Sequence, residues 1–141
     1  MKIIHQVFLD IGLTPLEERK DYLENIKIIK EMNPDWEHKL WTDDSVNEFV
    51  STHYPENLLY WNHFPYPMYK IDYIRYMILH YYGGIYVDLD EKNIKPLEEF
   101  DIFYGKWYDT KKQIWDINNN VIMIKDKLLL KELIDYVNTQ I

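Results

Sequence analysis

A helix, a Gly-Gly pair and an apolar strand follow one another directly between residues 68 and 89, and this succession limits the possible folds most. Apolar side chains recur at helical spacing from Met68 to Tyr82, and Gly83-Gly84 is a typical helix end. The strand that follows, Ile85 to Leu89, begins with three apolar residues, so both of its faces are predicted to be covered. Strands of this kind lie in the centre of a parallel sheet, between layers of helices.

The rest of the chain continues the alternation of strands and helices. Further strands are predicted at residues 2–8, 36–41, 93–95, 102–107 and 121–124, and a closing helix at 126–137. We therefore predict one domain over residues 1–141, with an α/β fold in which helices flank a Rossmann-like, mostly parallel central sheet.

Two more helices are predicted from capping signals. Thr14, Pro15 and Glu17 form the start signal of a helix that would continue to Asn33. The run TDDS at residues 42–45 begins the next helix. The apolar residues on the buried side of that second helix are predicted to be Val46, Phe49 and Val50.

Charge and composition exclude several classes of function. The net charge is -8 with only two arginines, which argues against nucleic acid or an anionic membrane as a partner. Because the chain has no cysteine, thiolate metal sites and thiol nucleophiles are excluded, and any metal must be bound by oxygen or imidazole. The five histidines show no ligand spacing. With no run of about 18 apolar residues and no signal-peptide pattern, we expect a cytoplasmic protein without a membrane span.

Two charged residues, Asp72 and Arg75, interrupt the apolar side of the helix at 68–82. At about 100° per residue, Arg75 falls inside the apolar stripe and Asp72 falls on its edge. A charge that points toward a core is costly unless it is paired. Two interpretations are open: an i,i+3 ion pair that neutralises itself, or a pair that faces a functional site.

Asp88 and Asp90 follow the apolar strand and lie on one side of it, at the end where α/β folds bind ligands. Two neighbouring carboxylates repel each other unless a cation lies between them, and oxygen ligands suit Mg²⁺ or Mn²⁺. One alternative is a solvated acidic turn. Another is a calcium loop with Glu99 as its last ligand, although Lys92 at a ligand position and Asn93 in place of the turn glycine argue against it.

The segment from Lys70 to Asp90, KIDYIRYMILHYYGGIYVDLD, resembles the DXD signature of glycosyltransferase family 32, the "sugar-binding region" proteins. It is also similar to the catalytic core of the large clostridial glucosylating toxins and of the α-1,4-galactosyl- and GlcNAc-transferases. KIIHQVF at 2–8, NPDWEHKLWTDD at 33–44 and KPLEEF at 95–100 resemble further segments of the family. The resemblance covers most of the chain up to about Phe100, and its central motif, Asp-x-x-Arg followed by Gly-Gly-x-Tyr-x-Asp-x-Asp, is specific.

The resemblance implies a compact GT-A nucleotide-diphospho-sugar transferase fold and a metal-dependent, configuration-retaining hexosyltransferase. The donor would be a UDP- or GDP-linked sugar, the metal Mn²⁺ or Mg²⁺, and the acceptor a glycan, lipid or protein. Carried over from the family, the catalytic residues are Asp72, Arg75, Asp88 and Asp90. Asp90 would ligate the metal directly, and Asp88 would contact the ribose or sugar and reach the metal mostly through water. Asp72 and Arg75 would hold the hydroxyls of the donor sugar.

The resemblance also implies donor-binding positions beyond these four. Phe8 stands where the family commonly has Trp, near the nucleobase, and Tyr86 belongs to the central motif. One of Asn119 and Asn120, with Asn120 favoured, corresponds to an Asn that reaches the donor sugar in relatives. The backbone residues that would line the base pocket are Ile4, His5, Gln6 and Val7.

Relatives continue past the late strand and helix with segments that supply a further metal ligand and much of the acceptor site. We therefore expect a minimal transferase, a donor-binding domain that another domain or subunit completes, or a degenerate copy. The principal alternative to a transferase is a non-catalytic module that binds a nucleotide sugar or a glycan. A metal-dependent phosphoryl-transfer enzyme or nuclease is less favoured, because the net charge is negative.

Overall fold

The computed structural model of the chain describes residues 2–12, 14–64, 67–94, 96–97, 102–109 and 114–139, and at 67, 102–109 and 114–120 only the backbone. Its strands are β1 (Ile3–Val7), β2 (Glu37–Trp41), β3 (Ile85–Val87), β4 (Ile102–Asp109) and β5 (Ile114–Ile124). Its α-helices are α1 (Lys20–Met32), α2 (Asp43–His53), α3 (Leu58–Asn62), α4 (Pro67–Tyr82) and α5 (Lys127–Asn138). Two short 3-10 helices are η1 (Leu16–Glu18) and η2 (Pro55–Asn57).

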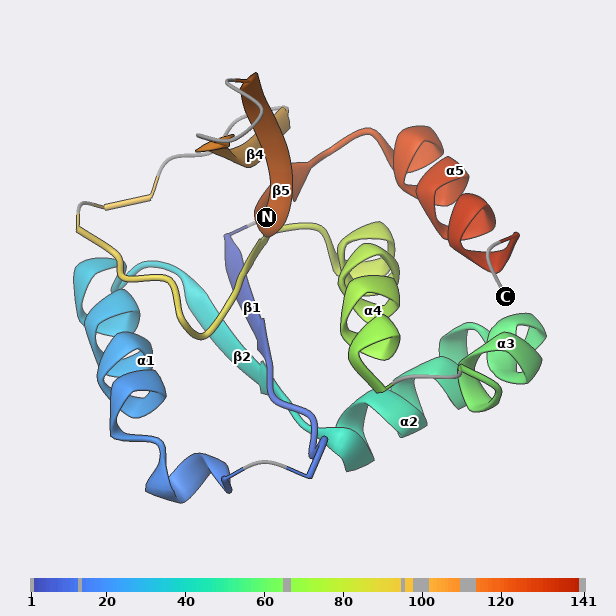
Figure 1. Cartoon of the computed structure of the whole chain (residues 1–141), viewed down its shortest axis with the longest axis horizontal. Helices are drawn as coiled ribbons and strands as arrows, with labels where there is room; N and C mark the ends of the chain where they lie inside the picture. The colour runs from blue at the N-terminus through green and yellow to red at the C-terminus, as the bar shows by residue number, and fades with distance from the viewer. Residues whose placement is uncertain are drawn as a thin grey trace.

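The strands form one sheet in the order β2-β1-β3-β5-β4 (Figure 1). β1 pairs in parallel with both β2 and β3. β5 runs antiparallel to β3, and β4 runs antiparallel to β5, so β4 has the same direction as the first three strands. The predicted α/β fold with a mostly parallel sheet is confirmed.

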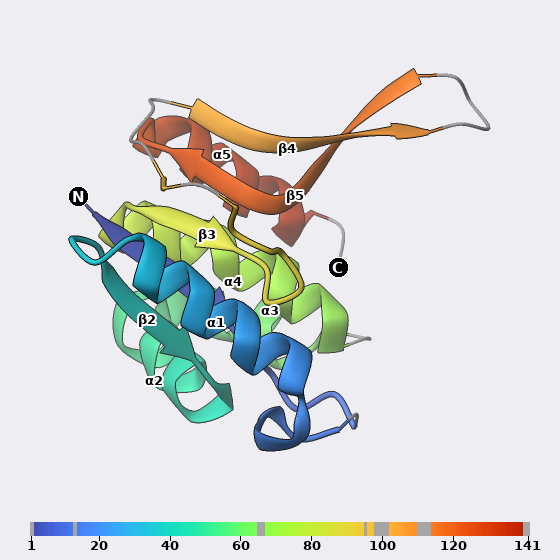
Figure 2. The same cartoon turned by 90° about the vertical axis from the view of Figure 1, so that its left-hand side faces the viewer.

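Helices cover both faces of this sheet (Figure 2). On one face, Ile4, Ile85 and Val87 form a core with Ile29 of α1. On the other face, Tyr86 packs into a larger core to which α2, α4 and α5 contribute. Successive residues of β3 therefore enter opposite cores, which is why its apolar run shows no alternation.

The turn between α4 and β3 brings two backbones into close contact. Gly83 and Gly84 have φ angles of 71° and 89°. A Cβ atom on Gly84 would lie 2.3 Å from the carbonyl oxygen of Ile3, so only glycine fits there. The turn thereby sets β3 beside β1 and directs the acidic motif to the carboxyl end of the sheet.

The single helix predicted from Thr14 onward is divided in the structure. Pro15 has an extended backbone (φ -56°, ψ 150°) and precedes the short η1, and Arg19 (φ -91°, ψ 83°) leaves the helical region before α1 begins. The predicted cap at Thr14 is wrong, because Pro15 caps the short η1 and Arg19 stands at the N-cap position of α1. The cap predicted for α2 is confirmed, with reciprocal bonds between Thr42 and Ser45.

The short strand predicted after the acidic motif is absent at Asn93 and Ile94, and Lys95 lies outside the described residues. Asn33, just after α1, gives the reason. Its side chain donates to Asn93 Oδ1 at 2.7 Å and accepts the Leu97 N–H at 2.7 Å. These bonds hold the segment against α1 and away from the sheet.

The hairpin of β4 and β5 is longer than the sequence predicted, and it extends beyond the rest of the sheet (Figure 2).

The longest helix of the described chain, α4, has 16 residues. None of the described helices combines the length and the apolar character that a membrane crossing requires.

Candidate active site

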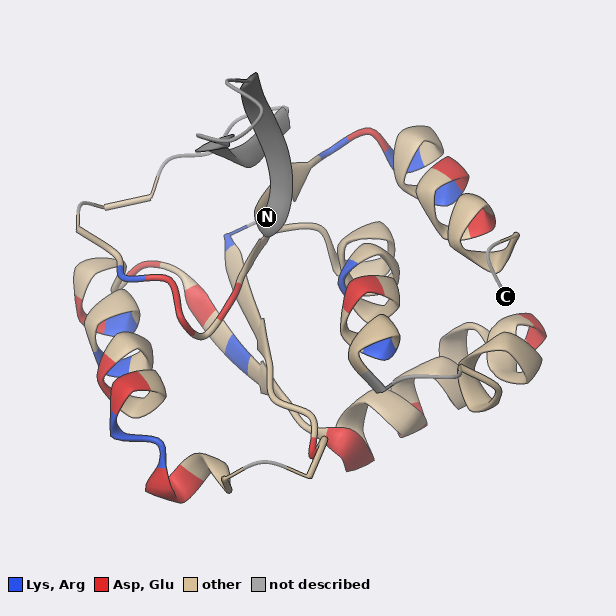
Figure 3. Ribbon diagram, in the orientation of Figure 1, with Lys and Arg blue, Asp and Glu red and all other residues tan. Residues whose placement is uncertain are grey.

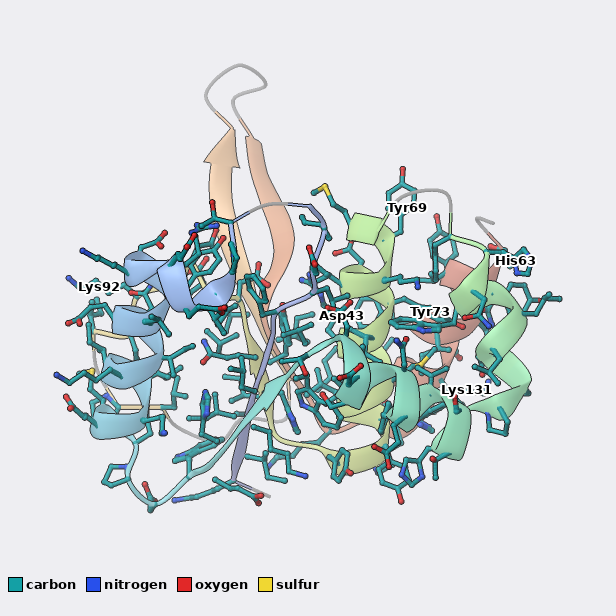
Figure 4. The ribbon with its side chains drawn as sticks, turned by 90° about the horizontal axis from the view of Figure 1, so that it is seen from below. Asp43, His63, Tyr69, Tyr73, Lys92 and Lys131 are labelled. Carbon is teal, nitrogen blue, oxygen red and sulfur yellow. The ribbon has the colours of Figure 1, made fainter. Side chains whose placement is uncertain are left out.

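A cavity of about 550 Å³ opens at the carboxyl ends of β1 and β3, between α1 and α4. Hydrogen bonds secure two of its walls. Asp43 at the start of α2, labelled in Figure 4, accepts the Asp10 N–H at 2.8 Å and so holds the segment after β1. Asn25 of α1 donates to the Leu89 carbonyl at 2.9 Å and holds the acidic turn after β3. The cavity lies where α/β sheets bind their ligands.

The structure brings most of the predicted site residues together. Figure 3 shows acidic positions on α4 and on the segment after β3. The backbone of Asn119 and Asn120 belongs to β5, and their side chains lie outside the described part of the chain. The predicted site residues that line the cavity are Val7, Phe8, Asp72, Arg75, Tyr86, Asp88 and Asp90.

Three predicted donor-binding residues, Ile4, His5 and Gln6, are not among the residues that line the cavity. All three are fully buried in β1. The His5 ring accepts the indole N–H of Trp41 at 3.2 Å, and its Nε2 donates to the Gly83 carbonyl at 2.9 Å. Burial lowers the pKa of His5 to about 4, so the ring is neutral at physiological pH and serves the packing of the sheet.

Arg75 is the charged centre of the cavity wall. It is buried, and its Nη2 lies 3.0 Å from Asp72 Oδ1 and 3.8 Å from Asp88 Oδ1. Its Nε donates to the Ile71 carbonyl at 3.2 Å, and its Cζ lies 4.6 Å from the centre of the Tyr86 ring. Two carboxylates and an aromatic face therefore compensate the buried guanidinium. The i,i+3 pair with Asp72 does form, but Arg75 also reaches a carboxylate on a different element.

Asp88 is constrained by its neighbours as well as by its strand. The Tyr86 hydroxyl donates to Asp88 Oδ1. Burial raises the pKa of the Asp88 carboxyl, Arg75 opposes the rise, and Asp90 adds to it. Burial also holds the pKa of Tyr86 well above its ordinary value, so the hydroxyl keeps the proton that it donates. The sequence carried a signal for this contact, because residues two apart on a strand point to the same side.

The acidic pair has the chemistry of a divalent-cation site. Asp90 is exposed at the cavity, the Asp88 side chain is 27% exposed, and a cation would relieve their repulsion. In the described part of the chain, no group of three or more His, Cys, Asp or Glu side chains could hold a metal. The pair therefore fits an ion such as Mn²⁺ or Mg²⁺, which completes its shell with water and phosphate oxygens. Glu99, which the calcium-loop alternative requires, lies outside the described residues.

The sequence did not predict one wall of the cavity. Arg19 and Tyr22, at the start of α1, line the cavity together with the predicted Phe8. Neither belongs to a motif, and Tyr22 reads as one more residue of an amphipathic helix. No local signal marks them, because the bond that joins Asn25, one helical turn after Tyr22, to the acidic turn spans 64 positions of the sequence.

The chain is similar to two fungal enzymes. It is 36% identical over 124 residues to inositol phosphoceramide mannosyltransferase 3 of Schizosaccharomyces pombe, a match covering 86% of this chain and 32% of that protein. It is 38% identical over 110 residues to the mannosyl phosphorylinositol ceramide synthase SUR1 of Saccharomyces cerevisiae, covering 74% and 27%. The chain thus spans about a third of the length of these curated relatives.

Among solved structures, the PaToxG glycosyltransferase aligns with a TM-score of 0.71, over 99% of this chain and 60% of that one. At 13% sequence identity this likeness shows a shared fold. Residues 19–107 match the family described as "Glycosyltransferase sugar-binding region containing DXD motif". This range includes all four predicted catalytic residues as well as Arg19 and Tyr22. The chain therefore belongs to the family of glycosyltransferases with a DXD-containing sugar-binding region.

Proposed function

We propose that this chain binds a nucleoside-diphosphate sugar and catalyses metal-dependent transfer of the sugar with retention of configuration. The observation that carries the proposal is the buried Arg75, which joins Asp72 of α4 to Asp88 after β3 within one cavity. A self-neutralising surface pair needs no second carboxylate from another element and no cavity. A solvated acidic turn, the other interpretation without a functional site, needs no buried arginine next to it.

Each of these residues has a distinct task in the proposed reaction. Asp90 and Asp88 would hold Mn²⁺ or Mg²⁺, which supplies positive charge to the diphosphate as it leaves. Arg75 adds a fixed positive charge that the protein has already oriented before the donor binds. Asp72 is paired with Arg75, but its side chain is 50% exposed, so it can accept hydroxyl groups of the donor sugar.

The acceptor is proposed from the relatives. The two fungal proteins are named for mannosyl transfer to inositol phosphoceramide. For this chain we propose that the transferred group is a hexose and that the acceptor is a glycan or a lipid. Since the chain spans about a third of those relatives, a further domain or subunit is proposed to complete the acceptor site.

Thermal denaturation with a panel of UDP- and GDP-sugars tests the donor site, with Mn²⁺, Mg²⁺ or EDTA in parallel. We expect at least one donor to raise the melting temperature only when the metal is present, because the phosphates share the ion with Asp88 and Asp90. Slow release of free sugar from that donor is the expected sign of catalysis. Stabilisation without any sugar release over a long incubation favours the non-catalytic binding module. If no nucleotide stabilises the chain in a metal-dependent way, the proposal is wrong.

Tyr86→Phe is expected to weaken metal binding selectively. Loss of the hydroxyl removes the hydrogen bond that orients Asp88 Oδ1, so the Mn²⁺ concentration for half-maximal sugar release should rise by about 10-fold to 100-fold. The donor KM at saturating Mn²⁺ should change little, because Arg75 remains in place.

Tyr73→Phe is the matched control. Tyr73 lies on α4 and is labelled in Figure 4. Its hydroxyl accepts from Asn57 at 2.7 Å and donates to Asn138, and the residue does not line the cavity. This variant should lose stability but keep the wild-type Mn²⁺ dependence. An unchanged Mn²⁺ dependence in Tyr86→Phe would show that the hydroxyl does not position Asp88.

A further inference from the structure

The start of α1 contributes a flat, preassembled surface to the cavity. The Arg19 guanidinium lies over the ring of Tyr22, with Cζ 3.7 Å from the ring centre. Phe8, at the end of β1, meets the same ring edge-on, at 6.5 Å between ring centres and 72° between planes. All three residues line the cavity that contains the acidic motif.

Hydrogen bonds along one edge of the Arg19 guanidinium hold it in place, and these bonds do not cover the faces of its plane. Asp21 accepts Nε–H at 3.2 Å and Nη2–H at 3.1 Å, a bidentate arrangement in the guanidinium plane. The Arg19 side chain is 25% exposed, and the side chain of Asp21 is 61% exposed. An exposed ion pair of this kind contributes little to stability, so its geometric effect is the more important one. One face of the guanidinium rests on Tyr22, and the other is directed away from the ring.

The position of this stack relative to the acidic motif matches the two-part chemistry of a nucleotide. Tyr22 lies one helical turn, about 5 Å of rise, before Asn25, and Asn25 bonds directly to Leu89 between the two aspartates. A nucleoside diphosphate carries its charge on the phosphates and a planar π-system on the base. The phosphates belong with Arg75 and the cation, whereas aromatic rings and guanidinium planes are the groups on which bases stack.

We propose that Arg19 and Tyr22 form the platform on which the nucleobase of the donor stacks, with Phe8 bracing the Tyr22 ring from its edge. This inference rests on the proposed function, since it assumes a nucleoside-diphosphate donor. It moves the stacking contact from Phe8, which the family resemblance places near the nucleobase, to a pair at the start of α1. Phe8 supports the platform, because its edge-on contact is with Tyr22 itself.

The test compares ligands with and without a base. Affinities of the full chain for UDP, GDP and inorganic pyrophosphate are measured by calorimetry with Mn²⁺ present, for the wild type and for Tyr22→Ala, Tyr22→Phe and Arg19→Lys. Stacking on an aromatic side chain is worth about 1–3 kcal/mol per base, which corresponds to a loss of roughly 5-fold to 150-fold. We expect Tyr22→Ala to weaken the preferred nucleotide by such a factor and to leave pyrophosphate unchanged.

The other variants separate stacking from charge and from folding. Tyr22→Phe should bind like the wild type, because the ring is kept. Arg19→Lys keeps the charge but loses the plane, so nucleotide affinity should fall while pyrophosphate affinity stays. Tyr136→Ala, at an exposed tyrosine of α5 outside the cavity, is the matched control and should bind like the wild type.

Two results overturn the platform while the proposed function stands. One is a wild type that binds a nucleotide with Mn²⁺ and a Tyr22→Ala variant that binds it equally well. The other is an equal loss of nucleotide and pyrophosphate, which would show that the pair acts on phosphate or on folding. If the wild type binds neither ligand, the proposed function fails first, and the platform fails with it.

Discussion

Asp90→Asn is expected to reduce metal-dependent release of sugar from the preferred donor by roughly 100-fold or more, the size of effect seen when a single electrostatic stabiliser of a leaving group is removed. The substitution keeps the shape of the side chain but removes its charge and one of its oxygens. Stability should hardly change, by about 0.5 kcal/mol at most, because Asp90 is exposed and lies outside both cores. Initial rates at several Mn²⁺ concentrations, together with urea denaturation, measure both quantities.

Glu91→Gln is the matched control for this experiment. Glu91 is the next residue of the same turn, and its backbone N–H donates to the Asp88 carbonyl at 3.2 Å, but it does not line the cavity. The control removes the same unit of charge and should retain wild-type rates. Full activity in Asp90→Asn would rule out Asp90 as the metal ligand, and equal losses in both variants would point to the overall charge of the turn.

Gly84→Ala is expected to lower the free energy of unfolding by roughly 3 kcal/mol or more, which places it among the severe single substitutions. The added Cβ would lie 2.3 Å from the Ile3 carbonyl oxygen and 3.1 Å from the Ile3 carbonyl carbon. Both are backbone atoms of β1, so relief requires the pairing of β1 with β3 to open. Since β3 carries the acidic motif at its end, donor binding should weaken in the same variant. Urea denaturation and donor titration measure the two effects.

Gly83→Ala separates close contact from backbone conformation. Gly83 also has a positive φ, 71°, but a Cβ there would meet no atom within 4 Å. Only the conformational penalty of about 1–2 kcal/mol is then expected. If the two variants lose equal stability, the contact with Ile3 is not what makes glycine necessary at residue 84.

Local patterns were enough to predict which polar residues of α4 and of the segment after β3 meet at one cavity. The helical spacing before Gly83 and the apolar run after Gly84 are properties of neighbouring residues, and the structure places α4 and β3 accordingly. The angle of Arg75 on the helix predicted an inward charge, and the residue is buried. The position of Asp88 and Asp90 at the end of the strand predicted that they lie at the ligand-binding edge of the sheet. Both aspartates and Arg75 line one cavity.

The same local rules failed at two places. The capping signal at Thr14 did not start a helix, because the chain stays extended at Pro15 and breaks again at Arg19. The strand expected around Asn93 did not form, because Asn33, 60 positions earlier, binds its side chain. A periodicity or a capping motif carries no information about such partners.

The sequence by itself determined the order of helices and strands and the four polar residues at the centre of the cavity, because spacing, turn chemistry and apolar runs act between near neighbours. Only the tertiary structure decided what encloses them. Asn25 meets Leu89 across 64 positions, and this contact brings the start of α1, with Tyr22, to the acidic turn. A cavity wall depends on which distant surfaces pack together, and that is settled by the packing of the whole sheet and its helices.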